Sequence, residues 1–380
     1  FIRILLQMKA NLNKVCEDMS KNPRNAELQI SCLISLYQPL KDEKDTERFQ
    51  NAFKTIDNTL KANANNSAVI LQVLNLFGQI VQIRTLSTLL EATNIFSQLM
   101  YILSLKKEDS EISEVCLSVI SRTIALPKMA SHFSSQNFIK SLVFITRLNS
   151  KSLIHASYIT SIALYINPRL EMALKDLCLA FIVLSRNFPK NELLQEKIIT
   201  GFAQMTGSKI MTEIASIAIP QFTDIALRYP KNINIIRSFL FVLCNSPENE
   251  ILSDDYTIIM NNCKQFKDDS QAIQKSIEFF TNKMDPKQIP VEALPLVILA
   301  IETFLTNTSI LKQTLTIGYY ATSSSSDDDP IPPKLIQLLT SVLLLHSRET
   351  SIVRRAAAII HVLSSNQNND THLYESSAPY

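Results

Sequence analysis

Residues 232–243 read NINIIRSFLFVL, one of nine stretches in this chain that share a pattern. An Asn begins the stretch, and apolar residues follow three, seven and eleven positions later, at Ile235, Phe239 and Leu243. Asn and Ser favour helix starts because their side-chain oxygens accept hydrogen bonds from first-turn amides. Steps of three to four residues place the apolar side chains on one helix face. The stretch therefore predicts an amphipathic helix that begins near residue 232.

The pattern recurs along the chain at a spacing of 38 to 43 residues. A period near 40 residues is typical of helical solenoids, in which each unit packs on its neighbours. One apolar stripe needs a second helix to cover it, and the rest of each unit contains a second apolar stretch. We therefore expect two helices per repeat, the first beginning at Asn25, Ser67, Ser110, Ser152, Asn191, Asn232, Ser270, Ser309 and Ser351.

The composition supports an all-α chain. Only 4 of 380 residues are glycine, so phosphate-binding glycine loops are not expected. The 37 basic and 35 acidic residues give a net charge of +2, which is no strong nucleic-acid signal. Apolar runs are far shorter than the roughly 18 residues of a membrane span. We predict protein or peptide partners and no membrane span.

Residues with catalytic or metal-binding chemistry are dispersed. The six cysteines are far apart, so we expect buried thiols in a reducing compartment, the cytoplasm. None of the five histidines has a metal-ligand partner at helical spacing. The acidic pairs Asp254-Asp255 and Asp268-Asp269 stand near helix starts, where negative charge is stabilising. The sequence thus predicts no catalytic residue, no metal and no cofactor, and we expect the chain not to be an enzyme.

Two junctions resemble armadillo repeats. Residues 331–339, followed by residues 351–360, look like the closing helix of one armadillo repeat and the opening helix of the next. Residues 137–148 and 152–164 are similar to the same junction. The resemblance covers residues 22–366. It implies a right-handed α-solenoid of about nine armadillo or HEAT-like repeats, whose inner face binds peptides or protein segments.

The resemblance also implies where a peptide would be held. Importin-type armadillo proteins grip basic peptides with arrays of Trp and Asn, and this chain has no Trp. A receptor for nuclear-localisation signals is therefore disfavoured. Counted from the nine starts, the corresponding positions hold a single Asn: Gln38, Ile80, Thr123, Tyr165, Gln204, Asn245, Lys283, Thr322 and Ser364.

The segment 322–330 reads TSSSSDDDP, which predicts an acidic loop between helices. Ser324, Ser325 and Ser326 each have an aspartate three residues later, as in sites of acidophilic kinases. These three serines are therefore candidate phosphorylation sites. Each phosphate would add negative charge that masks the groove or recruits a basic partner.

The expected organisation has three parts. Residues 1–21 are predicted to be a partial N-terminal helix of a longer chain, residues 22–366 the armadillo-like solenoid, and residues 367–380 a flexible tail. We expect a non-catalytic interaction scaffold or adaptor that binds partner segments along its surface. The alternatives are a regulatory or docking region of a larger enzyme, such as a protein kinase, and a nuclear-transport or ciliary scaffold component. The last would place the chain in the nucleus or on the cytoskeleton, and the oligomeric state is left open.

Overall fold

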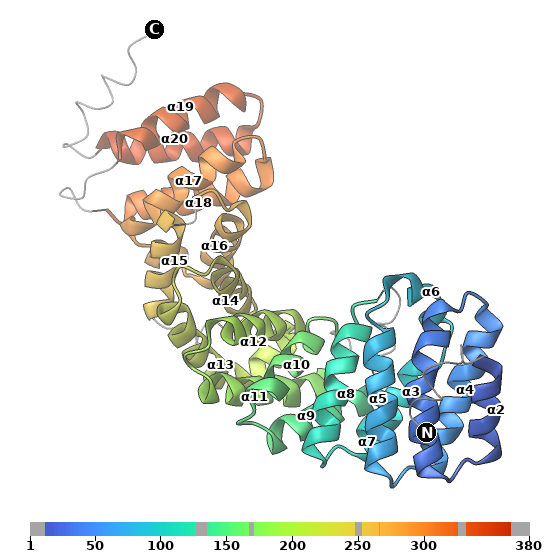
Figure 1. Cartoon of the computed structure of the whole chain (residues 1–380). Helices are drawn as coiled ribbons and strands as arrows, with labels where there is room; N and C mark the ends of the chain where they lie inside the picture. Colours follow the sequence, from blue (N-terminus) through green and yellow to red (C-terminus); the bar gives the residue numbers. More distant parts are fainter. Residues whose placement is uncertain are drawn as a thin grey trace. The chain divides into compact units, whose positions relative to one another are not determined.

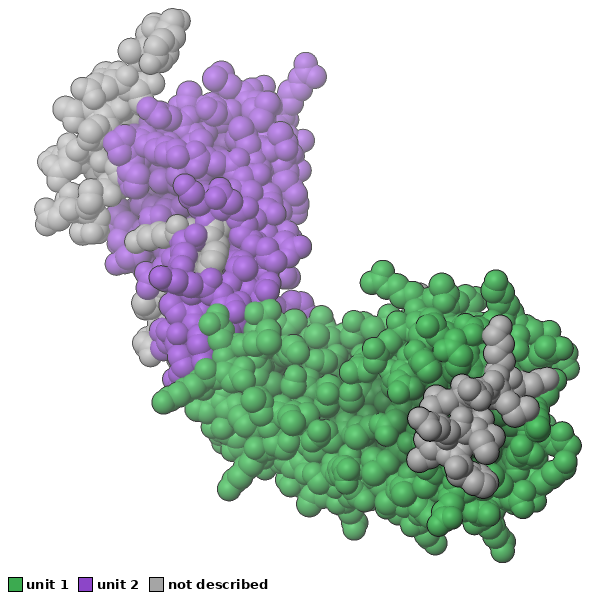
Figure 2. All heavy atoms as spheres, viewed as in Figure 1, with its two compact units in different colours: residues 1–205 green, residues 206–380 purple. Residues whose placement is uncertain are grey.

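The computed structural model describes residues 12–126, 135–166, 171–247, 253–265, 267–325 and 332–365. These residues form α-helices and short 3-10 turns, and no strand occurs among them. The all-α class expected from the sequence is confirmed. The chain divides into two compact units, residues 1–205 and residues 206–380 (Figure 2).

Unit 1 contains two alternating series of helices (Figure 1). The first series, called the opening helices, is α3 (Ala26–Asp42), α5 (Ser67–Ile80), α8 (Ser110–Thr123), α10 (Leu153–Ala163) and α12 (Glu192–Met205). Each opening helix packs on the next, from α3 through to α12. The remaining elements are α2 (Leu12–Lys21), α4 (Thr46–Ala62), η1 (Arg84–Leu86), α6 (Ser87–Glu91), α7 (Ile95–Leu105), α9 (Gln136–Leu148) and α11 (Glu171–Asn187).

Unit 2 is built in the same way. Its opening helices are α14 (Ile233–Asn245), α16 (Ser270–Lys283), α18 (Thr308–Ser323) and α20 (Thr350–Ser365), and each packs on the next. The other series also packs neighbour on neighbour, an arrangement compatible with a helical repeat protein. Its members are α13 (Ser208–Arg228), α15 (Ser253–Gln265), α17 (Leu294–Phe304) and α19 (Pro333–Leu345), with η4 (Pro286–Gln288) and η5 (Val291–Ala293) before α17.

The apolar stripes predicted from the sequence form the core. Ile235, Phe239 and Leu243 of α14 are all 0 % exposed. Where two helices approach closely, the stripe includes glycine. A Cβ atom on Gly318 of α18 would lie 3.1 Å from Val297 of α17 and 3.3 Å from Ile359 of α20. Gly318 therefore lets α18 pack tightly between two neighbours.

The nine predicted starts each lie within one residue of the first residue of an opening helix. Asn25, Ser152 and Asn232 accept first-turn amides as N-caps, and Asn191 accepts from the Leu194 amide at 3.0 Å. Ser67, Ser110, Ser270 and Ser309 were expected to cap their helices, and this is wrong. Each of these serines is already helical, and the cap is an Asn or Asp one or two residues earlier, where the backbone is extended: Asn66, Asp109, Asp269 and Asn307.

Hydrogen bonds join successive turns about one repeat apart. The Asn63 amide donates to the Pro23 carbonyl at 2.7 Å, and the Asn187 amide donates to the Ser150 carbonyl at 2.8 Å. In unit 2, His346 Nε2 donates to the Leu305 carbonyl at 2.7 Å. These bonds satisfy backbone carbonyls near helix C-termini, which have no partner within their own helix.

Two buried glutamines make a second kind of connection that the sequence analysis did not identify. Each lies four residues after an N-cap and is 0 % exposed. Gln29 Nε2 donates to the carbonyls of Met19 and Asn22, both at 2.9 Å. Gln195 Nε2 donates to the carbonyls of Ser185 and Phe188, both at 2.8 Å. Each glutamine thus donates to carbonyls ten and seven residues earlier in the chain, and these bonds join an opening helix to the end of the preceding helix.

Several expected boundaries fall at the edges of the described residues. Residues 12–21 form α2, whereas residues 1–11 and the expected tail, residues 367–380, lie outside the described part of the chain. Helix α18 continues to Ser323, so the acidic segment expected to begin at Thr322 begins two residues later, and residues 326–330 lie outside the description.

One helix in the described residues, α13, is long and apolar enough by composition to cross a membrane. Its apolar window, Lys209–Arg228, has a mean hydropathy of 1.2, and 56 % of it is buried within the protein. Core helices of soluble proteins have the same properties.

Candidate interaction surface

The sequence predicted peptide-binding positions thirteen residues after each helix start, by comparison with importin-type armadillo proteins. Because several N-caps lie one or two residues earlier than predicted, the corresponding positions in those helices also lie earlier. Counted from Ser67 and Ser110, these positions were Ile80 and Thr123, and both side chains are 0 % exposed. They cannot contact a ligand, so this placement is wrong. Thirteen residues after the observed caps of unit 1 lie five exposed side chains: Gln38, Gln79, Arg122, Tyr165 and Gln204.

These five residues belong to a larger surface on unit 1. Positions 6, 9 and 13 after a cap share one side of a helix, and here all fifteen such residues are at least partly exposed. Fourteen of them lie within the helices, and Tyr165 follows the end of α10. We call them the opening-helix face. None of them is acidic, two are cationic, and most carry an amide or a hydroxyl. From α3 to α12 they are Ser31, Ile34, Gln38; Gln72, Asn75, Gln79; Val115, Ser118, Arg122; Tyr158, Ser161, Tyr165; and Lys197, Thr200, Gln204.

Both cations on this face reach across to the preceding opening helix. Lys197 Nζ donates to Ser161 Oγ at 3.1 Å, and Arg122 donates to the Gly78 carbonyl at 3.5 Å. Gln38 donates to Asp42 at 2.7 Å on its own helix. The amides of Gln79 and Gln204 are exposed, so their donors and acceptors are accessible from solvent.

The equivalent face of unit 2 has a different character. Position 13 again holds amides, at Asn245 and Asn282. Position 6 of α16 is Lys275, which pairs with Glu278 at 2.5 Å and lies 5.5 Å from the centre of the Phe241 ring. This part of the chain therefore presents an ion pair and an aromatic ring beside the amides.

The candidate phosphorylation sites are not all within the described residues. The Ser324 hydroxyl donates to the Ile289 carbonyl at 2.8 Å, which links the end of α18 to the segment between η4 and η5. The Ser325 hydroxyl donates to the Thr322 carbonyl at 2.7 Å. Ser326 lies outside the described residues. A phosphate on Ser324 would remove a donor and place negative charge beside the Ile289 carbonyl.

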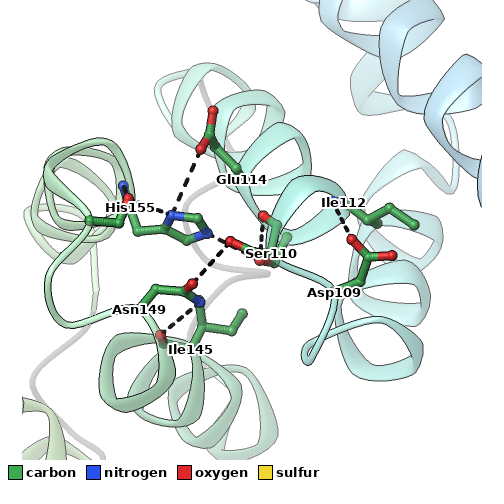
Figure 3. A network of polar contacts seen from close by, with 9 residues as sticks. Asp109, Ser110, Ile112, Glu114, Ile145, Asn149 and His155 are labelled. Carbon is green, nitrogen blue, oxygen red and sulfur yellow. Dashed lines mark hydrogen bonds and ion pairs between the residues drawn. The ribbon is translucent and has the colours of Figure 1, made fainter.

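A polar cluster with a buried centre joins α8, α10 and the turn after α9 (Figure 3). His155 is 1 % exposed, and its Nε2 lies 3.1 Å from the Ser113 hydroxyl. Its Nδ1 lies 3.0 Å from the Ser152 hydroxyl and 3.9 Å from the Glu114 carboxylate. The order of groups is serine, histidine and carboxylate, as in hydrolases that use a serine nucleophile.

The burial of this cluster argues against catalysis. Ser113 is 1 % exposed, and its hydroxyl donates to the Ser110 carbonyl at 3.1 Å. A neutral imidazole protonated on Nε2 satisfies the whole network, because Ser152 donates to Nδ1 and Nε2 donates to Ser113. Burial lowers the pKa of His155, while Glu114 and the Ser110 carbonyl act in the opposite direction. The cluster holds α8 against α10, and both the Ser113 hydroxyl and the imidazole are buried away from solvent.

The other titratable groups of the described residues form no metal site. Within the described ranges, no three His, Cys, Asp or Glu side chains are placed to share a metal ion. The buried Asp255 carboxylate accepts the Thr223 hydroxyl at 2.6 Å. Cys116 and Cys178 are fully buried free thiols, and burial raises the pKa of both. Cys16 and Cys244 are only partly buried, which differs from the expectation of uniformly buried thiols.

No protein-family model matches the sequence, and no curated protein matches it. The resemblance to armadillo and HEAT repeats therefore depends on the residues quoted above and on the packing of the helices.

Proposed function

We propose that the chain is a non-catalytic scaffold of the armadillo or HEAT type, a solenoid of repeats that binds an extended polypeptide segment. Binding would use the opening-helix face of unit 1. The observation that carries this proposal is the composition of that face, where amides and hydroxyls recur on five opening helices that pack on one another in chain order, and no acidic residue interrupts them.

Geometry supports an extended ligand. Packed helices lie about 8–10 Å apart, and an extended chain advances about 3.3–3.6 Å per residue. A segment that crosses the face would therefore place roughly every third residue over the next helix. Gln and Asn can donate to and accept from a peptide backbone at the same time, so such rows of amides suit main-chain recognition.

The free thiols support a reducing compartment such as the cytoplasm as the working location, as expected from the sequence. Phosphorylation of Ser324 is part of the proposal. It would break the hydrogen bond to Ile289 and so change the end of α18. A phosphopeptide map of the chain from its native cells checks this, and Ser324→Ala should remove the modification.

Site-specific photo-cross-linking in the native cells tests the proposed surface. A photoreactive amino acid at Ser118 or Ser161, in the middle of the face, should give a discrete cross-linked partner protein. The same group at Asn58, exposed on α4 outside the face, is the matched control. Equal cross-linking from Asn58, or none from Ser118 and Ser161, would contradict binding at this face.

A further inference from the structure

At the N-terminal ends of two neighbouring opening helices, α10 and α12, the surface beside the opening-helix face is apolar. Four large aliphatic side chains lie exposed where α9 ends and where α10 and α12 begin. Leu148, Leu153, Ile154 and Leu193 are 54 %, 44 %, 50 % and 64 % exposed. We call these four residues the apolar rim. Helices α10 and α12 pack on each other, so the rim spans adjacent repeats (Figure 1).

The rim is specific to these two repeats. Ile154 and Leu193 occupy the same register, two residues after the N-caps Ser152 and Asn191. The three preceding opening helices of unit 1 have Glu27, Ala68 and Glu111 at this position. Position 2 after a cap lies four residues, or about one helical turn, before position 6, which belongs to the opening-helix face. Ile154 and Leu193 therefore extend that face toward the N-terminal ends of α10 and α12.

Positive charge surrounds the rim. Lys151 and Lys190, both exposed, each stand immediately before an N-cap. The first turns of α10 and α12 add the positive ends of two helix dipoles. Arg147 lies 3.7 Å from Asp176, and Glu192 is the acidic residue in the first turn of α12. The lysines and helix ends therefore outweigh the nearby carboxylates and favour an anionic ligand.

We propose that the apolar rim binds an acidic aliphatic segment of a partner protein. A Leu, Ile or Val side chain of that segment would lie between Ile154 and Leu193, with Asp or Glu residues beside Lys151 and Lys190. The proposal rests on the proposed scaffold function and adds the chemical class of its ligand. A protein segment fits better than an anionic membrane because the rim continues into the amides and hydroxyls of the opening-helix face and has the acidic neighbours Glu192 and Asp176.

The test uses a random dodecapeptide display library panned on the whole chain. Enriched peptides should combine an aliphatic residue with Asp or Glu. A synthetic copy of the most enriched peptide is then measured by fluorescence anisotropy. Both the double variant Ile154→Ser/Leu193→Ser and the double variant Lys151→Glu/Lys190→Glu should bind about tenfold more weakly or worse. The control Leu105→Ser/Lys54→Glu, at exposed sites of unit 1 outside the opening-helix face, should stay within about twofold of the unmodified chain.

The variant Lys151→Glu/Lys190→Glu also shows whether weaker binding results from unfolding. Negative charge just before a helix N-terminus is favourable, so Lys151→Glu and Lys190→Glu should preserve or raise the melting temperature. Enriched peptides without acidic residues, or unchanged binding by both rim variants, would overturn the proposal. So would rim-dependent binding to vesicles of anionic lipid without binding to the peptide. If Ser118 cross-links a partner while the rim variants bind the peptide normally, the rim alone is rejected. If neither Ser118 nor Ser161 cross-links a partner in the unmodified chain, the scaffold function itself is rejected.

Discussion

Buried polar side chains hold neighbouring helices of this protein in place. His155 and the two glutamines Gln29 and Gln195 each bridge neighbouring helices from a position within four residues of an N-cap. Their hydrogen bonds are strong constraints because a buried polar group without a partner costs about 1–3 kcal/mol. His155 and Gln195 each give a measurable prediction.

The first prediction concerns acid sensitivity. The folded state lowers the pKa of His155 below its unfolded value near 6.5, so the unfolded chain binds a proton more readily. The stabilisation is complete above that value and is lost as the pH falls from about 6.5 toward the folded pKa. The free energy of unfolding should thus fall more steeply between pH 7.5 and pH 5 in the unmodified chain than in His155→Gln. His361→Gln, at an exposed site, should keep the unmodified slope.

The second prediction concerns Gln195. Gln195→Leu removes the donor to one buried and one partly buried carbonyl and should lower the free energy of unfolding by about 1–3 kcal/mol. Gln195→Glu should be worse, because it faces the same carbonyls with a buried carboxylate. Urea titration measures both. The exposed Gln204→Leu on the same helix is the control and should change stability by less than about 0.5 kcal/mol.

At the scale of helices, the sequence predicted what depends on periodicity. Ile235, Phe239 and Leu243 are buried because their spacing matches the helix period, and no tertiary information was needed. The caps were harder, since Asn66-Ser67 and Asp109-Ser110 each offer two competent residues. One residue is about 100° of helix rotation. The one-residue error therefore assigned a peptide-binding position to the buried Ile80 instead of the exposed Gln79. For the same reason, the opening-helix face could not be identified from the sequence.

The corrected cap of α5 can be tested directly. The Asn66 side chain accepts from the amides of Ala68 and Val69 at 3.1 Å and 3.2 Å. Asn66→Ala should therefore cost about 1 kcal/mol. Ser67→Ala should be neutral or stabilising, because Ser67 is helical and Ala has the higher helix propensity. If Ser67→Ala lowered the free energy of unfolding more than Asn66→Ala in a denaturation experiment, Ser67 would be the cap.

Replacing glycine by alanine should raise stability at Gly78 and lower it at Gly318. Gly→Ala in a helix gains about 0.5–1 kcal/mol where space allows. A Cβ on Gly78 would sit at an ordinary 3.6 Å from Val119, so Gly78→Ala should stabilise the chain. On Gly318 it would crowd Val297 and Ile359, and such overpacking costs about 1–3 kcal/mol. Gly318→Ala should lower the melting temperature; a rise would show that α17 and α20 can move apart.

At the scale of the whole molecule, each helix depends on its immediate neighbours. Within each unit the opening helices pack in chain order, so the effect of a substitution should stay local. Hydrogen exchange read by mass spectrometry can show this. Gly318→Ala should speed exchange in α17, α18 and α20 and leave α3, α5 and α8 unchanged. Faster exchange in those three distant helices would mean that the chain opens as one cooperative body.

The same neighbour packing bears on how the chain is made. The hydrogen bonds between turns join residues 37 to 41 positions apart, as from Asn187 to Ser150 and from His346 to Leu305. Ribosomes add about 5–20 residues per second, so a repeat of this size emerges within roughly 2–8 seconds. Each new helix pair finds its packing partner already synthesised. The protein is therefore suited to fold from its N-terminal side during translation, with one unfinished helix pair exposed at a time.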